Sequence, residues 1–298
     1  MTQDQHTPTD PTTAHRSPEE QSGTKIDHPG LTDDMPESPD HGEDSYRGSG
    51  KLTGKRAVIT GGDSGIGRAV AIAFAREGAD VLIVHLPDER EDAAETVGWV
   101  ERAGRRGIAV PGDLRDEAFC QSVVERAVTD LGGVDILVNN AAYQMAVEGL
   151  ADLSTEQLVR TFTTNVFAMF WLTKAALPHL QPGSTVINTS SVQAYTPQPM
   201  LLDYAATKAA IVNFTKGLSQ ELAPKGIRVN TVAPGPVWTP LIPSTMPAEA
   251  VSDFGTQTPT GRAGQPAELA PAYVFLASQE SSFITGERIG VTGGLPLS

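Results

Sequence analysis

A tyrosine and a lysine lie four residues apart in the segment Tyr204-Ala-Ala-Thr-Lys208. On a helix, this spacing places a phenol and an ammonium group on one face. A free phenol has a pKa near ~10, and a neighbouring cation lowers that pKa by favouring the phenolate. The pair could therefore donate and accept a proton, although Tyr/Lys pairs are also common on exposed helices. Ser191, 13 residues upstream, adds a hydroxyl after an expected strand.

Glycines gather in a second segment, Thr60-Gly61-Gly62-Asp63-Ser64-Gly65-Ile66-Gly67. Glycine lets the backbone turn tightly and lets a pyrophosphate approach bare N–H groups at the start of a helix. The spacing G-x-x-x-G-x-G differs from the G-x-G-x-x-G of the broader dinucleotide fingerprint. Taken alone, the segment is also consistent with an ordinary glycine-rich turn between a strand and a helix.

The composition narrows the classes of protein that fit. The 298 residues carry 22 Lys and Arg against 36 Asp and Glu, a formal net charge of −14, which argues against a general nucleic-acid binder. A single cysteine, Cys120, excludes a disulfide framework and a cysteine-based zinc site, and a reduced cytoplasmic setting fits. The sequence contains no run of 18 apolar residues, so no membrane span is expected. The polar N-terminus lacks the apolar region of a signal peptide.

The charge is concentrated at the N-terminus. Residues 1–50 hold 11 acidic and 3 basic side chains, six prolines and only six apolar residues. Such a segment buries too little apolar surface to offset its ordering entropy, so we expect a disordered acidic extension over residues 1–45 whose first 40 residues can be removed without loss of turnover. Four histidines lie there at spacings that match no compact metal site, and we expect them to be solvated and to bind no metal: His6, His15, His28 and His41.

Strand and helix signals alternate from residue 55 onward. Strands are expected at 56–60, 81–84, 108–110, 135–138, 185–188, 228–232 and 288–291, and helices at 66–76, 88–103, 116–131, 154–176, 203–223 and 266–277. This alternation predicts an α/β fold, a doubly wound seven-stranded parallel sheet of Rossmann type with helices on both faces. Residues 46–298 would form this one domain, with Cys120 in its core. The Pro/Gly-rich segment 234–265 is too long for a plain connection and is predicted to be a substrate lid.

The motifs, taken in order, resemble those of the short-chain dehydrogenase/reductase family. The resemblance covers residues 51–298 and is carried by TGxxxGIG at Thr60–Gly67, Asp113 after the third strand, NNAA at Asn139–Ala142, Asn165, Ser191, Tyr204xxxLys208 and Pro234-Gly235-x-x-x-Thr239. One departure is Ala142, where the family usually has glycine. A methyl group there would tighten the cofactor pocket slightly without abolishing binding.

The resemblance implies an NAD(P)-dependent oxidoreductase with a specific set of site residues. Tyr204 would be the general acid in reduction, Ser191 would bind the substrate oxygen, and Lys208 would hold the ribose and lower the phenol pKa. Asn165 would anchor a water of a proton relay. The implied cofactor site consists of Gly61, Asp63, Ser64, Gly65, Ile66, Gly67, His85, Leu86, Asp113, Leu114, Asn140, Ala141, Tyr204, Lys208, Pro234, Gly235, Val237 and Thr239.

The choice between NAD and NADP is left open by the residue at the end of the second expected strand. An NAD-selective fold places an acid there and an NADP-selective one supplies arginine, whereas this chain has His85. We expect use of both cofactors. If His85 contacts the 2′ position, the preference for NADPH should rise as the pH falls from about 8 to about 6.

The runs TGGDSGIGRA, INTSSVQAY and LLDYAATKAAI resemble a bacterial subgroup with an acidic N-terminal extension and a Y-x-G-S-G-K-L lead-in, here Tyr46 to Leu52. Members are described as general-stress oxidoreductases or aldehyde reductases, so a small aldehyde or ketone is the expected substrate. A 3-oxoacyl-carrier-protein reductase fits less well, because the lid offers Glu249 and Asp253 against one basic residue, Arg262.

Two further interpretations stay open. A sugar dehydrogenase would line its pocket with hydroxyl-binding groups, and the candidate substrate residues are Gln144, Gln193, Gln198 and Trp238. A catalytically silent nucleotide-sensing scaffold would be expected to lack Tyr204 or Lys208, and both are present. Apolar residues on more than one face of helices 154–176 and 203–223 predict burial between subunits, and the family precedent is a homotetramer.

Overall fold

The computed structural model describes residues 4–15 and 23–298. Within them, one sheet of parallel strands runs in the order β3-β2-β1-β4-β5-β6-β7. Its strands are β1 (Arg56–Thr60), β2 (Asp80–His85), β3 (Gly107–Pro111), β4 (Ile136–Asn139), β5 (Thr185–Thr189), β6 (Arg228–Pro234) and β7 (Arg288–Val291). The order reverses direction between β1 and β4, which places a crevice at their carboxyl ends.

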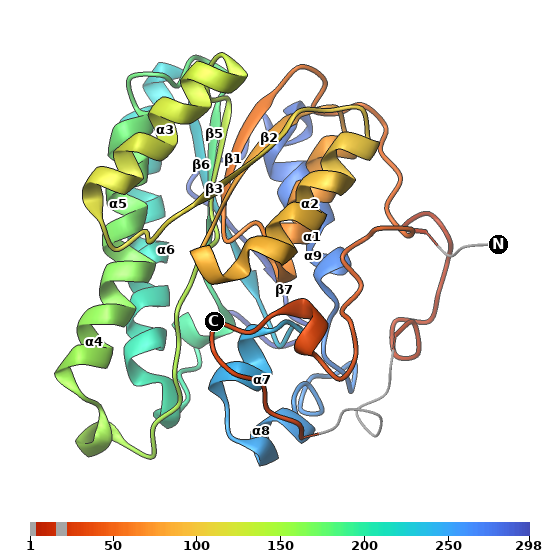
Figure 1. Ribbon diagram of the computed structural model, residues 1–298, viewed down its shortest axis with the longest axis vertical. Helices are drawn as coiled ribbons and strands as arrows, with labels where there is room; N and C mark the ends of the chain where they lie inside the picture. Colours follow the sequence, from red (N-terminus) through yellow and green to blue (C-terminus); the bar gives the residue numbers. More distant parts are fainter. Residues whose placement is uncertain (1–3, 16–22) are drawn as a thin grey trace.

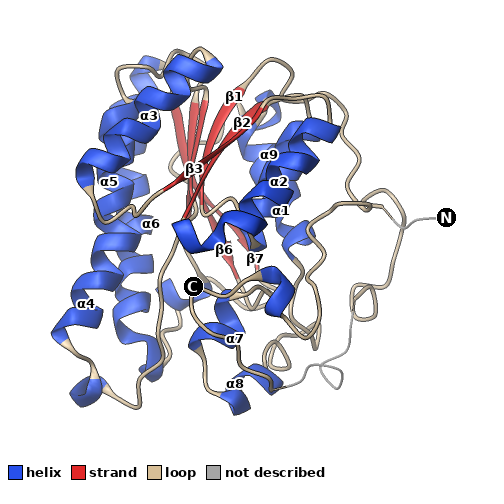
Figure 2. Cartoon of the chain, in the orientation of Figure 1, coloured by secondary structure: helices blue, strands red, loops and turns tan. Residues whose placement is uncertain are grey.

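Helices cover both faces of this sheet (Figures 1 and 2). One face packs against α1 (Gly65–Arg76), α2 (Arg90–Arg102) and α9 (Pro266–Ala277), and the other against α3 (Glu117–Leu131), α5 (Ala168–Ala176) and α6 (Leu202–Leu222). Alternate residues of β1 serve the two cores: Ala57 and Ile59 face the first, and Val58 faces the second. Cys120 is fully buried in the second core, as predicted.

All seven predicted strands and six predicted helices are present in the described residues, and the expected fold class is confirmed. Two segments are more complex than expected. The helix predicted over 154–176 consists of α4 (Thr155–Phe162), a π-helical turn (Thr163–Phe167) and α5. The lid contains two short helices, α7 (Leu241–Thr245) and α8 (Ala248–Ser252).

The π-helical turn is centred on Asn165. Its side-chain Oδ1 accepts from the Tyr143 N–H at 2.7 Å, and its Nδ2 donates to Tyr143 O at 2.9 Å and to Thr207 Oγ1 at 3.0 Å. The widened turn therefore carries a side chain that ties the segment after β4 to α6. Single π-type turns inside α-helices are frequent at functional sites.

The lead-in Tyr46–Leu52 packs on the domain around one carboxylate. Glu77, at the end of α1, accepts hydrogen bonds from the Tyr46 hydroxyl at 2.7 Å, the Ser49 N–H at 2.8 Å and the Lys51 N–H at 2.9 Å. Leu52 is fully buried in the first core. Three donors of this short segment thus share a single acceptor on the domain.

The acidic extension contributes no strand to the sheet, and within 4–15 and 23–45 its only regular element is a single 3₁₀ turn, Thr32–Asp34. Residues 23–45 nevertheless lie against the domain, where composition alone suggested free chain. Met35 is buried. His41 is 2% exposed, with its Nδ1 3.1 Å from Glu43 Oε1, so the prediction that this histidine is solvated is wrong. Residues 1–3 and 16–22 of the predicted disordered segment lie outside the described residues.

Among the described helices, none is long and apolar enough to cross a membrane.

Candidate active site

The carboxyl ends of the strands surround a cavity of about 1280 Å³. Nearly all of the predicted site residues line it, from the glycine loop after β1 to Thr239 after β6. Three do not: Gly67, Asn165 and Trp238. Gly67 lies behind the loop, Asn165 forms the buried links described above, and Trp238 is buried with its Nε1 donating to Glu37 O at 3.1 Å. Trp238 therefore does not reach this cavity, and the prediction that it contacts the substrate there is not supported.

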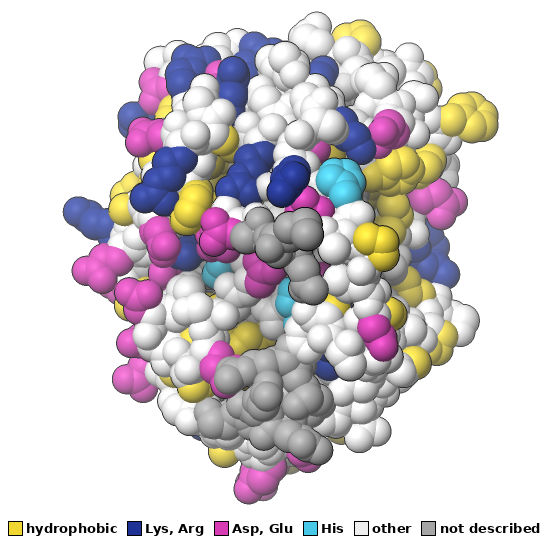
Figure 3. All heavy atoms as spheres, turned by 90° about the vertical axis from the view of Figure 1, so that its right-hand side faces the viewer, with side chains coloured by type: hydrophobic (Ala, Val, Ile, Leu, Met, Phe, Trp, Pro, Cys, Tyr) yellow, Lys and Arg dark blue, Asp and Glu magenta, His cyan; other side chains and the backbone are white. Residues whose placement is uncertain are grey.

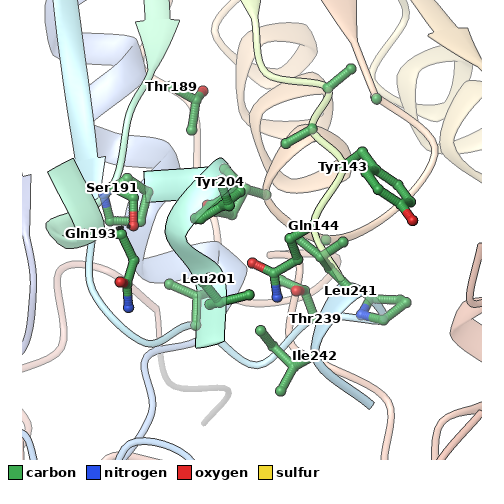
Figure 4. Close-up of a pocket in the computed structure, with 18 of the residues that line it drawn as sticks. Tyr143, Gln144, Thr189, Ser191, Gln193, Leu201, Tyr204, Thr239, Leu241 and Ile242 are labelled. Carbon is green, nitrogen blue, oxygen red and sulfur yellow. Dashed lines mark hydrogen bonds between the residues drawn. The ribbon is translucent and has the colours of Figure 1, made fainter. Parts of the chain in front are cut away.

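The predicted catalytic groups meet at the centre of the cavity (Figure 4). Tyr204, in the first turn of α6, lies beside Ser191, which follows β5 and caps the start of a short 3₁₀ helix; Gln144, Thr239 and Ile242 lie across from them. Lys208 Nζ, one turn along α6, donates to Thr189 O at 2.9 Å and lies 5.2 Å from the centroid of the Tyr204 ring. The helix spacing seen in the sequence does put both side chains at one site.

Burial controls the protonation of this pair. It raises the pKa of the Tyr204 phenol to about 12, and a hydrogen bond with Ser191 opposes the rise. Burial also lowers the pKa of the Lys208 ammonium to about 7. The phenol pKa is thus raised, where the sequence predicted a depression by Lys208, because both charged forms lose water in the same pocket. Tyr204 carries its proton at neutral pH, the form that a proton donor needs.

The glycine loop fits a pyrophosphate. Gly61 and Gly65 have positive φ angles of 59° and 50°, and a Cβ on Gly67 would stand 1.8 Å from Gly61 O, so a side chain at Gly67 would push the loop out of this shape. The N-cap Ser64 makes no side-chain capping bond, which leaves first-turn N–H groups of α1 available to an anion.

Neighbouring strands hold this loop in place. Asn140 Nδ2 donates to Thr60 O at 3.2 Å and Gly61 O at 3.1 Å, and the Asn140 N–H donates to Thr60 Oγ1 at 2.9 Å. Behind the loop, the fully buried Arg68 donates from Nε to Asp63 O at 2.7 Å and from an NH2 group to Asp92 Oδ1 at 3.0 Å. The loop is therefore rigid before any ligand arrives.

The part of the cavity near the end of β2 is acidic. Burial raises the pKa of Glu89 to about 8, and neighbouring Asp63 adds to the rise; burial likewise raises the pKa of Asp63. His85 is buried, its Nδ1 lies 2.7 Å from Leu86 O, and burial lowers its pKa. The predicted protonation of His85 near neutral pH is thus not supported, because its neutral form is favoured.

Two of the predicted cofactor residues follow β3. Asp113 and Leu114 line the cavity after β3, and Asp113 pairs with Arg115, which lowers the pKa of the aspartate. On the substrate side, Gln144 and Gln193 line the cavity as predicted. No sequence motif pointed to Tyr143 or His28, or to the apolar lining there, which comes from Met200, Leu201, Ile242, Met246 and Phe254.

Comparisons with known proteins agree with this geometry. The family model described as enoyl-(acyl carrier protein) reductase matches residues 61–296. A short-chain dehydrogenase from Burkholderia cenocepacia, solved in complex with NADP, superposes with a TM-score of 0.77 at 35% identity, over 82% of this chain and 98% of that chain.

The chain belongs to the short-chain dehydrogenase/reductase family. It is similar to the oxidoreductase YhxD of Bacillus subtilis, with 57% identity over 91% of this chain and 92% of that protein. General stress protein 39 of the same organism is 52% identical over 91% and 94% of the two chains, and the chloroplastic NADPH-dependent aldehyde reductase 1 of Arabidopsis thaliana is 47% identical over 89% and 94%. The chain is an NAD(P)-dependent oxidoreductase of the subgroup expected from its sequence.

Proposed function

We propose that this enzyme reduces small aldehydes or ketones, with Tyr204 as proton donor and Ser191 as the group that binds the carbonyl oxygen. The observation that carries the proposal is the buried Tyr204 beside Ser191 at the centre of a cavity that Met200, Ile242 and Met246 line with apolar surface. A phenol held neutral by burial donates a hydrogen bond to the carbonyl oxygen and gives up its proton as that oxygen gains charge.

The other proposed roles belong to residues that bind and orient. When bound, the nicotinamide dinucleotide supplies the hydride. The glycine loop would hold its pyrophosphate, Asp113 and Leu114 its adenine, and Val237 and Thr239 its carboxamide. Lys208 has ammonium protons beyond its one bond to Thr189, and these would reach the ribose hydroxyls. Asn165 would act as a positioning residue, because it fixes Thr207 beside Tyr204 on α6.

The substrate side of the cavity favours a simple carbonyl over a sugar. Gln144 Nε2 is engaged by Thr245 Oγ1 at 3.0 Å, and Gln193 Oε1 accepts from the Gln198 N–H at 2.8 Å. These amides are partly used within the protein, whereas Met200, Ile242 and Met246 offer only apolar surface. A polyhydroxylated substrate would leave several hydroxyls without partners.

A carrier-protein substrate has less support. Arg262, the basic residue of the lid, is 5% exposed and pairs with Glu268 at 2.7 Å. It is therefore unavailable to an acidic partner, and the lid presents Asp253 to the cavity instead. An enzyme that docks an acidic carrier needs an exposed basic rim.

The test is a substrate screen with purified protein, NADPH and NADH, against aldehydes, ketones, sugars and acyl thioesters. We expect kcat/KM for medium-length aldehydes to exceed that for sugars by at least about tenfold, the equivalent of one missing hydrogen bond to a hydroxyl. Faster turnover of glucose-type sugars or acyl-carrier thioesters would select one of the alternatives. Dinucleotide binding without turnover of any carbonyl would favour the silent sensor.

The proposal includes a homotetramer. Three apolar side chains on the α4–α5 surface, Val159, Phe167 and Phe170, are 56%, 47% and 48% exposed, and Phe170 contacts the ring of Phe214 on α6. An apolar patch of this kind marks an interaction site. Light scattering at micromolar concentration is expected to give four times the mass of the chain, and a monomer would reject this part.

A cytoplasmic location and small-molecule partners complete the proposal. The lone, buried Cys120 fits a reducing compartment. On the face shown in Figure 3, Lys and Arg side chains are interspersed with Asp and Glu, which favours neither a nucleic acid nor an anionic membrane as partner.

A further inference from the structure

Residues 26–37 of the extension, here called the strap, run over the cavity from the lid to α2. At one end, the Ile26 N–H donates to Pro243 O in the lid at 3.3 Å. Further along, the Thr32 N–H and Oγ1 donate to Asp92 Oδ2 on α2, at 2.9 and 3.0 Å. Between these two anchors, His28 and Pro29 line the cavity.

The strap is joined to the glycine loop through buried charges. The carboxylate of Asp92 that receives Thr32 also receives Arg68, and Arg68 donates to Asp63 O in the loop. Thr32 and Asp92 are each about 4% exposed. The strap is therefore bonded to the same rigid network that shapes the pyrophosphate cradle.

The strap also contacts the segment after β4 and the lid. The His28 ring meets Tyr143, which follows β4, edge to face at a centroid distance of 5.4 Å, and Arg160 covers the same Tyr143 ring at 4.1 Å. Gly30 has φ +89°, and a Cβ there would stand 2.9 Å from Pro240 O, so the strap passes directly against the lid. Met35 then enters the apolar cluster that contains Tyr204 and Trp238.

We propose that the strap is part of the dinucleotide-binding site: it covers the bound cofactor between the glycine loop and the lid and slows its release. This inference rests on the proposed function, since it takes the cleft to hold a dinucleotide. The strap lies outside the segment matched by the family model, which begins at residue 61. The proposal also reverses the expectation that residues 1–40 can be removed without loss of turnover.

Gly30→Ala tests the proposal, because a methyl group there meets Pro240 O and strains a positive φ. Gly54→Ala is the matched control: Gly54 has φ +75°, and no atom lies within 4 Å of the position that a Cβ would take there, so the backbone strain is similar but the strap is untouched. His28→Ala removes the ring contact with Tyr143 and the part of the cavity lining that His28 provides, and leaves the strap backbone unchanged.

The measurements use full-length protein with NADPH and NADH: dissociation constants by calorimetry, release rates by stopped-flow fluorescence, and melting temperatures. We expect Gly30→Ala to raise the NADPH release rate and dissociation constant about tenfold over Gly54→Ala, and His28→Ala to raise both about threefold. NADPH should also slow tryptic cleavage after Lys25 in the wild type and not in Gly30→Ala.

Equal release rates in Gly30→Ala and Gly54→Ala, with a wild type that binds NADPH and reduces aldehydes, would overturn the strap and leave the proposed function standing. A wild type that binds neither dinucleotide would overturn both.

Discussion

The two walls of the cleft are built in different ways. The inner wall consists of short segments that follow β1, β4 and β5, together with Tyr204 and Lys208 on α6. The outer wall consists of the strap and the lid, and the hydrogen bond between Glu37 and Trp238 joins them across 201 residues of sequence. Parallel strands bring their carboxyl ends to one edge by topology alone, so the inner wall follows from local motifs, whereas the outer wall depends on packing between distant segments.

The largest effect is expected on the inner wall, where Tyr204→Phe removes only the proton donor. We expect kcat to fall about 10²- to 10⁴-fold, with the dissociation constant of the dinucleotide nearly unchanged. Tyr195→Phe, at a tyrosine that does not line the cavity, is the control. Retention of more than about a tenth of wild-type kcat would remove Tyr204 from its role.

The link between the walls is tested by Arg68→Met, which leaves Asp92 buried without its cation. Breaking a buried pair in this way costs about 3–5 kcal/mol, so the free energy of unfolding should fall by that order and dinucleotide binding should weaken. Arg126→Met breaks an exposed pair with Asp130 and should cost less than about 1 kcal/mol. Similar losses in the two variants, by denaturant titration, would show that the network does not join the walls.

A position outside both walls sharpens the comparison by changing stability alone. Glu77→Gln should lower the free energy of unfolding by about 1–3 kcal/mol at pH 7, because it weakens hydrogen bonds to a carboxylate. These bonds lower the pKa of Glu77 below 4.5 in the folded protein, although burial opposes them. The stabilisation is therefore present above about pH 4.5 and lost as the pH falls through the folded pKa, where the two proteins should converge. A change in cofactor affinity would contradict the separation of this site from the cleft.

The smallest effect concerns cofactor choice at the acidic end of the inner wall. Glu89 faces Asp63, Asp88 and Asp92, and its raised pKa means that it gains a proton as the pH falls from about 8 toward 6. Loss of that charge reduces repulsion of a 2′-phosphate, so kcat/KM for NADPH over NADH should rise a few-fold over this range. Glu89→Gln should flatten the profile and His85→Gln should keep it. The reverse pattern would return the switch to His85.

The sequence was sufficient to predict those parts of the molecule that depend on short local motifs. Strand ends, the glycine loop and the Tyr204/Lys208 spacing each express a local rule, and their placement followed. The direction of the pKa shift of Tyr204 differs from the expectation, because desolvation depends on everything that surrounds the phenol, and a helix face shows only the cation beside it. The position of the extension escaped prediction for a related reason. Its composition does not show that Met35 packs into an apolar cluster of the domain or that Thr32 donates to Asp92.

The long sequence separations of the strap have a consequence for the order of folding. Glu37, at the end of the strap, is held by Trp238, 201 residues away, and the nearby Asp40 is held by Gln265, 225 residues away. A ribosome releases the strap long before these two partners, so these bonds form only after most of the domain has been made. Contacts that close such long loops form late. In a pulse-labelling hydrogen-exchange experiment, the Ile26 amide, which donates to Pro243 O, should therefore gain protection after the sheet amides of β1 and β4.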